Sequence, residues 1–465
     1  MDATTQDLLS PWVLAGALAA MLVVAALVLV FINATAKKVA PVALLLAGFC
    51  LEVYFFKQPF FNLGLQVYPN DIISVIVLLA ALVGFAYRPL PMNDSPFLLW
   101  LAFGVTMIAS FVVGLSEHGR YAGTEVRPFF YMWVAGLYCC VAGFDEKDLG
   151  RIARWCLWTA YALIGIAAYY YLAVEVGVVN RAETFDGPLD GVFRPVGSHG
   201  TFFVGAVGLV QTMAWLRRTG TRLAGLHAAI FMAFVVLMQH RSVWIAVGVG
   251  LLAVFLLERR HLPRRFALLL GFTMAVALAT AIAAAFGMLD SLTRDLTRST
   301  ITMFESEGTF AGRVDGWIRL LEQWLAASPM TLLFGFPFGQ GYTRLYNGVV
   351  IEFAPHNFFI DLLLRVGIVG TLLFLLATLL ALLHGLFAKV ISEFDYLLAR
   401  GLGVALVASL VYFVAYPSYY LIGGATGLAL AHLIAHRHRQ RAPGRPLDPV
   451  RSPITGQVIG WHARR

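Results

Sequence analysis

Segments of about 18 or more apolar residues recur along nearly the whole of this chain, and no other feature restricts its fold as strongly. They have the length of a helix that crosses the hydrocarbon core of a bilayer, where the backbone must satisfy its own hydrogen-bonding groups. Sixty per cent of the 465 residues are apolar and only 13% are charged. A water-soluble domain cannot bury so much apolar surface. The sequence therefore predicts an all-α polytopic membrane protein.

Hydropathy predicts about 12–13 transmembrane helices in this chain. The first apolar run is too long for a signal-peptide core and has no basic segment before it, so we expect a spanning helix there. The second contains Pro41 and Glu52 and has the weakest pattern. The predicted spans lie near residues 11–33, 39–56, 70–87, 96–114, 126–143, 152–175, 200–216, 223–239, 242–257, 266–287, 366–388, 397–415 and 418–435.

The distribution of Lys and Arg predicts which connections face the cytoplasm. One set of alternate connections, together with the C-terminal tail, carries 22 of the 34 basic residues, and the opposite side carries 12. Because positive charge accumulates on the cytoplasmic side, we expect the first set and the C-terminus to face the cytoplasm. The tail, residues 436–465, is basic and proline-bearing and is expected to be disordered. The net charge of +8 thus reports mainly orientation and predicts no nucleic-acid partner.

The same orientation places the one long loop, residues 289–356, outside the cytoplasm. Its segment GRVDGWIRLLEQWLAAS puts Trp317, Leu320, Leu321 and Trp324 on one face of a helix. Pro329 ends the pattern, and the glycine-rich FGFPFGQG follows. We expect this amphipathic helix to lie against the bilayer surface or to cap the helix bundle. A site on this side has no direct use of ATP or cytosolic nucleotide-sugars.

Three arginines are predicted on the outer side of the membrane, at the ends of helices: Arg194, Arg241 and Arg313. Moving a charge toward hydrocarbon costs about 2.5–3.5 kcal/mol on insertion scales, so each is expected to have a partner or a function. Each alone is accounted for by contact with head groups or a nearby acid. Together they favour an anionic ligand such as a diphosphate, because guanidinium groups bind phosphate through paired hydrogen bonds and stabilise it as a leaving group.

His356 and Asn357 stand immediately before a strongly apolar run. A neutral imidazole is able to take a proton from a sugar hydroxyl, which makes His356 a candidate general base. In the alternative interpretation the pair only caps a helix. Gly367 and Gly370 then serve only close helix packing.

No metal site or cofactor is predicted. The acids on the outer side are scattered, the histidines lack zinc-ligand spacing, and the four cysteines lie inside apolar segments.

The pattern His-Asn, nine residues, Gly-Ile-Val-Gly resembles the signature of the O-antigen ligase family. The segment AGRVDGWIRLLEQWLAASPMTLLFGFPFGQGY is similar to the family's Arg-containing helix and glycine turn upstream of that histidine. QHRSVWIAVGVG resembles the family's short outer turn, although Ser242 follows Arg241 here instead of preceding it. The resemblance covers roughly residues 190–390.

This resemblance implies a GT-C-like fold and a metal-independent, inverting glycosyltransferase that takes a glycan from undecaprenyl diphosphate to an acceptor hydroxyl. It also implies the inner membrane of a bacterium, with the long loop and the active site on the periplasmic side. It implies that Arg194 and Arg241 bind the diphosphate and that His356 activates or orients the acceptor. Arg313 would hold the diphosphate or the loop, and Lys57 is a weaker candidate for the same anionic site.

Several organisational and functional alternatives stay open at this point. We expect N-terminal helices over residues 1–190, a ligase-like core over 191–390 and two last helices over 391–435. The acceptor is lipid A-core for an O-antigen ligase, another lipid-linked repeat for an O-antigen or exopolysaccharide polymerase, or a protein. Polysaccharide assembly proteins are possible partners. A flippase for lipid-linked glycans, a membrane scaffold and an unrelated cell-wall polymerase are the alternatives from other classes.

Overall fold

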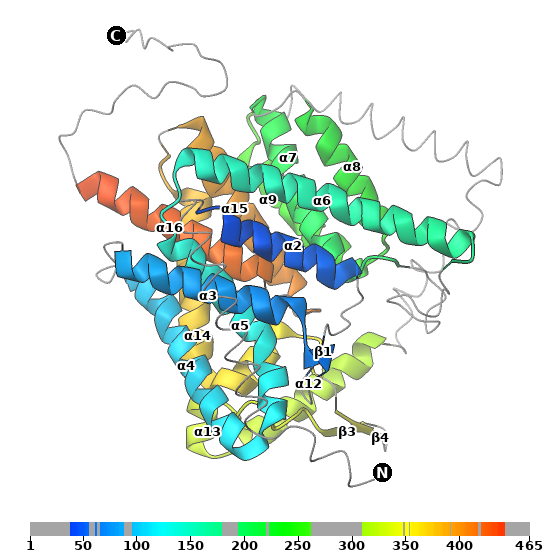
Figure 1. Ribbon diagram of the computed structural model, residues 1–465, viewed down its shortest axis with the longest axis vertical. Coiled ribbons are helices and arrows are strands. Elements are labelled where there is room, and N and C mark those ends of the chain that lie inside the picture. The colour runs from blue at the N-terminus through cyan, green and yellow to red at the C-terminus, as the bar shows by residue number, and fades with distance from the viewer. Residues whose placement is uncertain are drawn as a thin grey trace.

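Figure 1 shows the protein as a computed structural model. Helices of very different tilt form one bundle, with a group of shorter elements at its lower end in that view. The structure describes residues 38–54, 61–62, 66–87, 95–178, 194–219, 223–261, 309–346, 349–352, 354–390, 392–416 and 420–441.

The described ranges contain thirteen helices and two short antiparallel hairpins. The hairpins pair β1 (Phe61–Asn62) with β2 (Gln66–Val67) and β3 (Arg344–Tyr346) with β4 (Val349–Ile351). The helices are α2 (Ala40–Tyr54), α3 (Pro69–Tyr87), α4 (Ser95–His118), α5 (Arg120–Val141), α6 (Glu146–Glu175), α7 (Ser198–Arg217), α8 (Ala224–Leu237), α9 (Arg241–Leu257), α12 (Thr309–Leu325), α13 (Pro329–Phe334), α14 (Phe358–Phe387), α15 (Glu393–Tyr412) and α16 (Tyr420–Arg441).

The predicted fold class is confirmed: the protein is an all-α polytopic membrane protein. Within the described residues, five helices are long and apolar enough to cross a bilayer, namely α3, α4, α6, α14 and α15, and α2, α8 and α9 are shorter apolar helices. Every predicted span that falls on described residues coincides with a helix. The spans predicted near 11–33 and 266–287, most of the loop before residue 309 and the tail after 441 lie outside the described residues, so the count of 12–13 stays a prediction.

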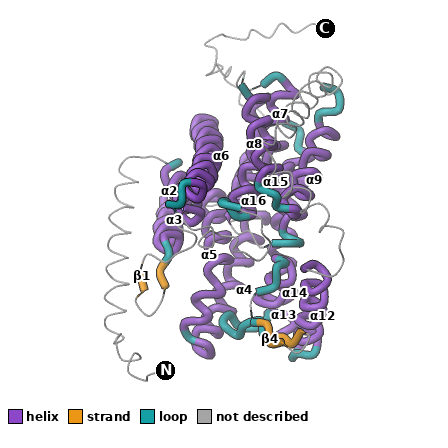
Figure 2. The backbone as a smooth tube through the Cα atoms, turned by 90° about the vertical axis from the view of Figure 1, so that its right-hand side faces the viewer, coloured by secondary structure: helices purple, strands orange, loops and turns teal. Residues whose placement is uncertain are grey.

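Two groups of helices make up the bundle. In the first, α5 packs against α3, α4 and α16, and α14 packs against α4, α15 and α16. In the second, α7 contacts α8 and α9, and α15 joins this group to α14. Figure 2 shows α7, α8 and α9 side by side at one end and α4, α12 and α13 toward the other. Helix α15 therefore links the two groups.

Two tryptophans fix how α4 and α5 pair. The indole N–H of Trp100 donates to the carbonyl of Trp133 at 3.1 Å, and the indole N–H of Trp133 donates to the carbonyl of Trp100 at 3.2 Å. Glycines on the facing helices make room for the rings, because a Cβ on Gly104 would overlap Trp133 and a Cβ on Gly136 would overlap Trp100. Both buried indole donors are thus satisfied within the helix pair.

The amphipathic helix predicted in the loop is α12, and it caps the bundle. Its buried residues Leu320 and Trp324 pack with Tyr342 and with Leu364 of α14. Of the two predicted positions, on the bilayer surface or over the bundle, the contacts show the second. Figure 1 places α12, α13 and the β3–β4 hairpin together at the end of the molecule where α14 begins.

Candidate functional site

Asn357 is the N-terminal cap of helix α14 and lies immediately before its first residue. Its side-chain Oδ1 accepts hydrogen bonds from the backbone N–H groups of Phe359 at 3.0 Å and Ile360 at 3.2 Å. The backbone N–H of Phe358 donates to the carbonyl of Phe413 at 2.9 Å, which ties the start of α14 to the end of α15. The cap satisfies donors that the first helical turn leaves open. It also fixes His356, the residue before it, at the mouth of the bundle.

Gly367 explains the nine-residue spacing of the motif. It has φ 64° and ψ −168°, a conformation nearly confined to glycine, so it interrupts α14 after the nine residues from Phe358 to Val366. A Cβ at Gly367 would overlap the carbonyl oxygen of Leu333, and the facing Gly335 lies equally close to the α14 backbone. The backbone N–H of Phe336 donates to the carbonyl of Leu364 at 2.6 Å. The break thus lets the glycine-rich turn approach α14.

The span predicted near residues 366–388 corresponds to α14, but its predicted start is wrong, because the helix begins eight residues earlier, at Phe358. Helix α14 begins at Phe358, because Asn357 caps it there. Asp361 and Arg365 lie inside the segment and lower its hydropathy, although both side chains are buried. Gly370 lies against Val366 and Thr106 of α4 and has no room for a Cβ, as close helix packing requires.

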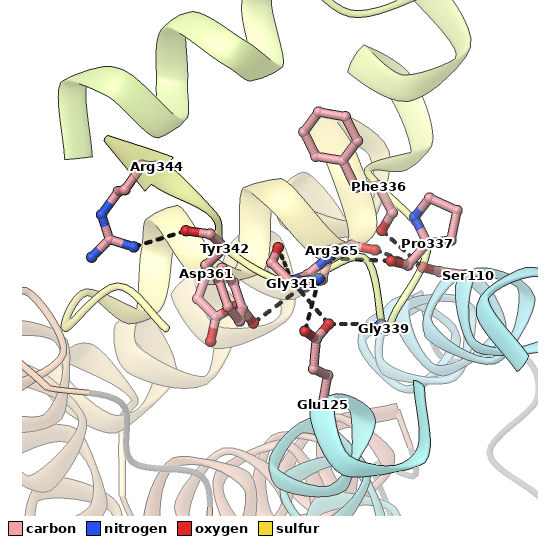
Figure 3. Close-up of polar contacts among 10 residues, drawn as sticks. All are labelled: Ser110, Glu125, Phe336, Pro337, Gly339, Gly341, Tyr342, Arg344, Asp361 and Arg365. Atoms are coloured by element: carbon pink, nitrogen blue, oxygen red, sulfur yellow. Dashed lines mark hydrogen bonds and ion pairs between the residues drawn. The ribbon is translucent and has the colours of Figure 1, made fainter. Parts of the chain in front are cut away.

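Arg365 is the centre of a buried polar cluster that holds the glycine-rich turn (Figure 3). Its guanidinium lies 2.9 Å from a carboxylate oxygen of Glu125 in α5 and donates to the carbonyls of Gly341 at 2.8 Å and Pro337 at 3.2 Å. The same carboxylate accepts the backbone N–H groups of Gly339 at 2.7 Å and Gly341 at 3.0 Å. Both charges are thus paired and hydrogen-bonded, as a buried ion pair requires.

Tyr342 and Asp361 complete this cluster. The Tyr342 hydroxyl donates to Asp361 at 2.6 Å and accepts from Nε of Arg365 at 3.2 Å. Burial, followed by the nearby Asp361 carboxylate, raises the pKa of Tyr342 well above its ordinary value, so the phenol keeps its proton. We call these residues, Glu125, Tyr342, Asp361 and Arg365, the anchor cluster, because they fix the loop to α5 and α14.

His356 and Arg313, two of the residues predicted from the sequence, both lie against the ring of Tyr416. Its ring centroid is 5.7 Å from that of Tyr416 in an edge-on arrangement, and the guanidinium carbon of Arg313 is 5.3 Å from the same ring centroid. Burial, and then the charges of Arg313 and Arg344, lower the pKa of His356 below its ordinary value. The imidazole is therefore neutral at neutral pH and is able to accept a proton.

The two other predicted arginines both lie close to His240, in the turn between α8 and α9. Nε2 of His240 lies 2.9 Å from the carbonyl oxygen of Val196, which joins this turn to the segment that carries Arg194. Burial is the main cause that lowers the pKa of His240 to about 4, and the charge of Arg194 acts in the same direction. Arg241 is the next residue and the first of α9. Within this tight turn, Gln239 has a left-handed backbone conformation, with φ 55°.

Two tyrosines at the end of α15 connect the His240 turn with the His356 region. The Tyr412 hydroxyl donates to Oγ of Ser198 at 2.8 Å, close to the Arg194 segment. Its ring stacks on Tyr416 with centroids 5.9 Å apart, and Tyr416 contacts both His356 and Arg313. Arg313 and His356 thus both lie against Tyr416, and Arg194 and Arg241 lie on the two segments that the contact of His240 with Val196 joins. Lys57 lies outside the described residues.

Sequence reasoning missed Arg344, Tyr412 and Tyr416. Arg344 is buried and donates to the carbonyl of Tyr342 at 3.0 Å, and its charge reaches His356. A signal was present, since Arg344 follows the glycine-rich turn in the predicted periplasmic loop and is a fourth arginine on that side. The tyrosines of SLVYFVAYPSYY have no spacing that distinguishes them from membrane-interface aromatics.

The central part of the chain is similar to a known protein family. Residues 226–375 match the family model described as O-Antigen ligase. The matched segment begins in α8 and ends within α14, so it contains Arg241, Arg313 and His356 and excludes Arg194. No curated protein matches the chain. The match supports an O-antigen ligase or polymerase type of membrane enzyme, and with the helices described above it indicates a multi-pass bacterial membrane protein.

Proposed function

We propose that this chain, whose residues 226–375 match the O-antigen ligase family, transfers a glycan from undecaprenyl diphosphate to an acceptor hydroxyl at the periplasmic face of the inner membrane. The observation that carries the proposal is the shared contact of His356 and Arg313 with Tyr416. It brings a neutral imidazole and a guanidinium to one helix end, beside the turn that carries Arg241. A base and a cation are the two groups that this transfer needs.

In the proposed reaction the acceptor oxygen attacks the anomeric carbon from the face opposite the diphosphate. The new glycosidic bond forms as the bond between the anomeric carbon and the diphosphate oxygen breaks, which inverts the configuration. The acceptor proton passes to the His356 imidazole, which its lowered pKa leaves unprotonated. The lipid carrier keeps the donor at the membrane surface, so the protein mainly has to orient the two reactants.

Arg194, Arg241 and Arg313 are the proposed ligands of the leaving diphosphate. Guanidinium forks form paired, charge-assisted hydrogen bonds to phosphate and counter the negative charge that develops as the bond breaks. No metal ion is required in this scheme, because arginines supply the positive charge. Arg344 joins this set as a further cation beside His356. Asn357, Gly367 and Gly370 support the site by positioning the first segment of α14.

The acceptor decides between ligase and polymerase, and both stay within the proposal. A strain that lacks the protein tests this directly when lipid-linked glycan, surface polysaccharide and lipopolysaccharide are measured together. Single repeats accumulating on the carrier lipid indicate a polymerase. Long lipid-linked polymer with bare lipid A-core indicates a ligase. Lipid-linked repeats retained on the cytoplasmic leaflet would contradict the proposal and indicate a flippase.

Complementation of that strain tests the assigned residues. We expect His356→Ala and Arg241→Ala each to leave the donor unused, while the protein is still found folded in the membrane. The matched control is Arg154→Gln, because Arg154 is an exposed arginine of α6. Normal glycan transfer in the His356→Ala strain would refute the role of this histidine.

A further inference from the structure

Three helices that reach the candidate site also build a pocket at their other ends. Helices α7 and α9 begin near the site and α15 ends there, and each runs 17 to 20 residues, or about 25–30 Å. That length is about the thickness of the hydrocarbon core. At the far ends lies a cavity of about 540 Å³. Its lining consists of Arg217, Leu256, Leu257, Arg259, Arg260, His261 and Tyr396.

Arg217, in the last turn of α7, lines the pocket and is held in place by two carboxylates. It pairs with Glu393 of α15 through two contacts of 2.5 and 2.9 Å and with Glu258 at 3.3 Å. Its guanidinium carbon lies 3.8 Å from the centroid of the Tyr396 ring. Two carboxylates therefore neutralise this arginine and join the ends of α7, α9 and α15.

Arg259 and Arg260 supply positive charge that these carboxylates do not use. Both follow α9 directly and are exposed, and within the described ranges neither forms an ion pair. Glu258, the residue before them, is fully buried and already pairs with Arg217. Nε2 of His261 lies 3.9 Å from the same carboxylate. Among the described residues, three arginines line the pocket, and the carboxylates of Glu258 and Glu393 both pair with Arg217, so the positive charges of Arg259 and Arg260 are left without a carboxylate.

Part of the lining of the pocket is aliphatic. Leu256 and Leu257 line it, and Leu256 is 65% exposed, as is much of Leu252 one turn earlier in α9. These side chains continue outward onto the apolar surface of a membrane helix. A pocket that is cationic at the helix ends and aliphatic toward the bilayer matches a phosphate group attached to hydrocarbon chains, because basic pockets between such helices hold lipid head groups.

We propose that the α7–α9–α15 pocket binds a phosphate group, held by Arg259 and Arg260 at its mouth. An anionic lipid head group or a soluble phosphate carries the same chemistry, and the aliphatic wall favours the lipid. This site lies about a membrane thickness from His356 and takes no part in the proposed glycan transfer. Phosphate binding here fastens the ends of three helices that all extend to the candidate site.

Thermal unfolding of the delipidated full-length protein in detergent tests this proposal. The probes are phosphatidylglycerol with eight-carbon chains, phosphatidylcholine with the same chains, and inorganic phosphate. We expect phosphatidylglycerol to raise Tm and phosphatidylcholine to leave it nearly unchanged, since a ligand that binds only the folded state stabilises it. A rise with inorganic phosphate alone, matched in size by the lipid, supports the site and identifies a soluble phosphate as its ligand.

Variants separate this pocket from general surface charge. In Arg259→Gln/Arg260→Gln the apparent affinity for phosphatidylglycerol should fall by about tenfold or more, since charge-assisted hydrogen bonds are lost. The lysine pair Arg259→Lys/Arg260→Lys should retain part of it, and Arg154→Gln all of it. Both arginines are exposed, so the fold should survive. An unchanged response in the glutamine variant, or equal stabilisation by phosphatidylcholine, would overturn the proposal.

Discussion

Arg365 and Arg313 lie at the same end of the molecule, yet their surroundings differ completely. Arg365 is 1% exposed, and Glu125, Tyr342 and two backbone carbonyls occupy its guanidinium. Arg313 is partly exposed and lies over the Tyr416 ring, next to His356. The first arginine holds the loop in place, whereas the second keeps part of its side chain exposed beside His356. Surroundings, more than position along the chain, separate a structural arginine from a candidate ligand-binding one.

The same contrast holds for the groups around the two arginines. The anchor cluster is a closed network in which each charge has a partner, so removing one member leaves another charge buried without compensation. His356 has a lowered pKa and an edge-on contact with an aromatic ring. A change there should alter chemistry more than folding. Activity and stability are therefore the two measurements that test the comparison.

The largest effect is expected for His356→Gln. Loss of a general base lowers a rate by about 10²–10⁴-fold, and glutamine keeps the polarity and most of the volume of the imidazole. The transfer rate should be measured with purified protein in proteoliposomes, and Tm in the same preparation. A variant that loses activity together with a large drop in Tm would place His356 with the anchor cluster instead.

Arg365→Met should produce the opposite result. It leaves the Glu125 carboxylate buried without its cation, which costs about 3–5 kcal/mol of folding free energy and lowers the yield of folded protein. The double variant Glu125→Gln/Arg365→Met should recover part of that loss, because the two residues are directly coupled. Unfolding in detergent measures both. Full stability in Arg365→Met would mean that the loop does not depend on this ion pair.

Gly367→Ala should have a smaller effect on stability. The φ and ψ of this residue are strained for any side chain, at about 1–3 kcal/mol, and a Cβ would also overlap the Leu333 carbonyl. Gly165→Ala in α6 is the matched control: its Cβ meets open space, and alanine favours a helix by up to about 1 kcal/mol. Equal behaviour of the two variants in thermal unfolding would remove Gly367 as the cause of the break in α14.

The smallest effect concerns pH. Because the pKa of His356 is lowered, its neutral form predominates at pH 7, and transfer should fall only as the pH drops below about 6.5. Arg313→Gln removes one cause of this lowering, so the acidic limb of the rate profile should move toward higher pH. A limb that stays in place in this variant would separate Arg313 from His356.

Much of this fold follows from hydropathy, because a helix in lipid needs only length and apolar side chains. The cap and the glycines of α14 could also be located, since the His-Asn-x9-Gly spacing is local in sequence. The face of α12 was predicted from its period, and Leu320 and Trp324 are indeed buried. What these features share is that neighbours along the chain determine them.

The anchor cluster could not be predicted in this way. Glu125 and Arg365 come from helices 240 residues apart, and nothing in either segment indicates the other partner. Read alone, Arg365 looks like the end of a loop, and the span appears to begin after it. Burial of its charge is tolerated only because Glu125, Tyr342 and the loop carbonyls meet it in three dimensions. Tyr416 likewise joins the site through tertiary packing alone.

The reciprocal hydrogen bonds of Trp100 and Trp133 also bear on how the chain enters the membrane during synthesis. Trp100 leaves the ribosome first, and its acceptor follows on the next helix, after a turn at Gly119. Until α5 arrives, the indole N–H of α4 has no protein acceptor from this pair. The α4–α5 hairpin, rather than α4 alone, is therefore the smallest unit that crosses into lipid with both donors satisfied.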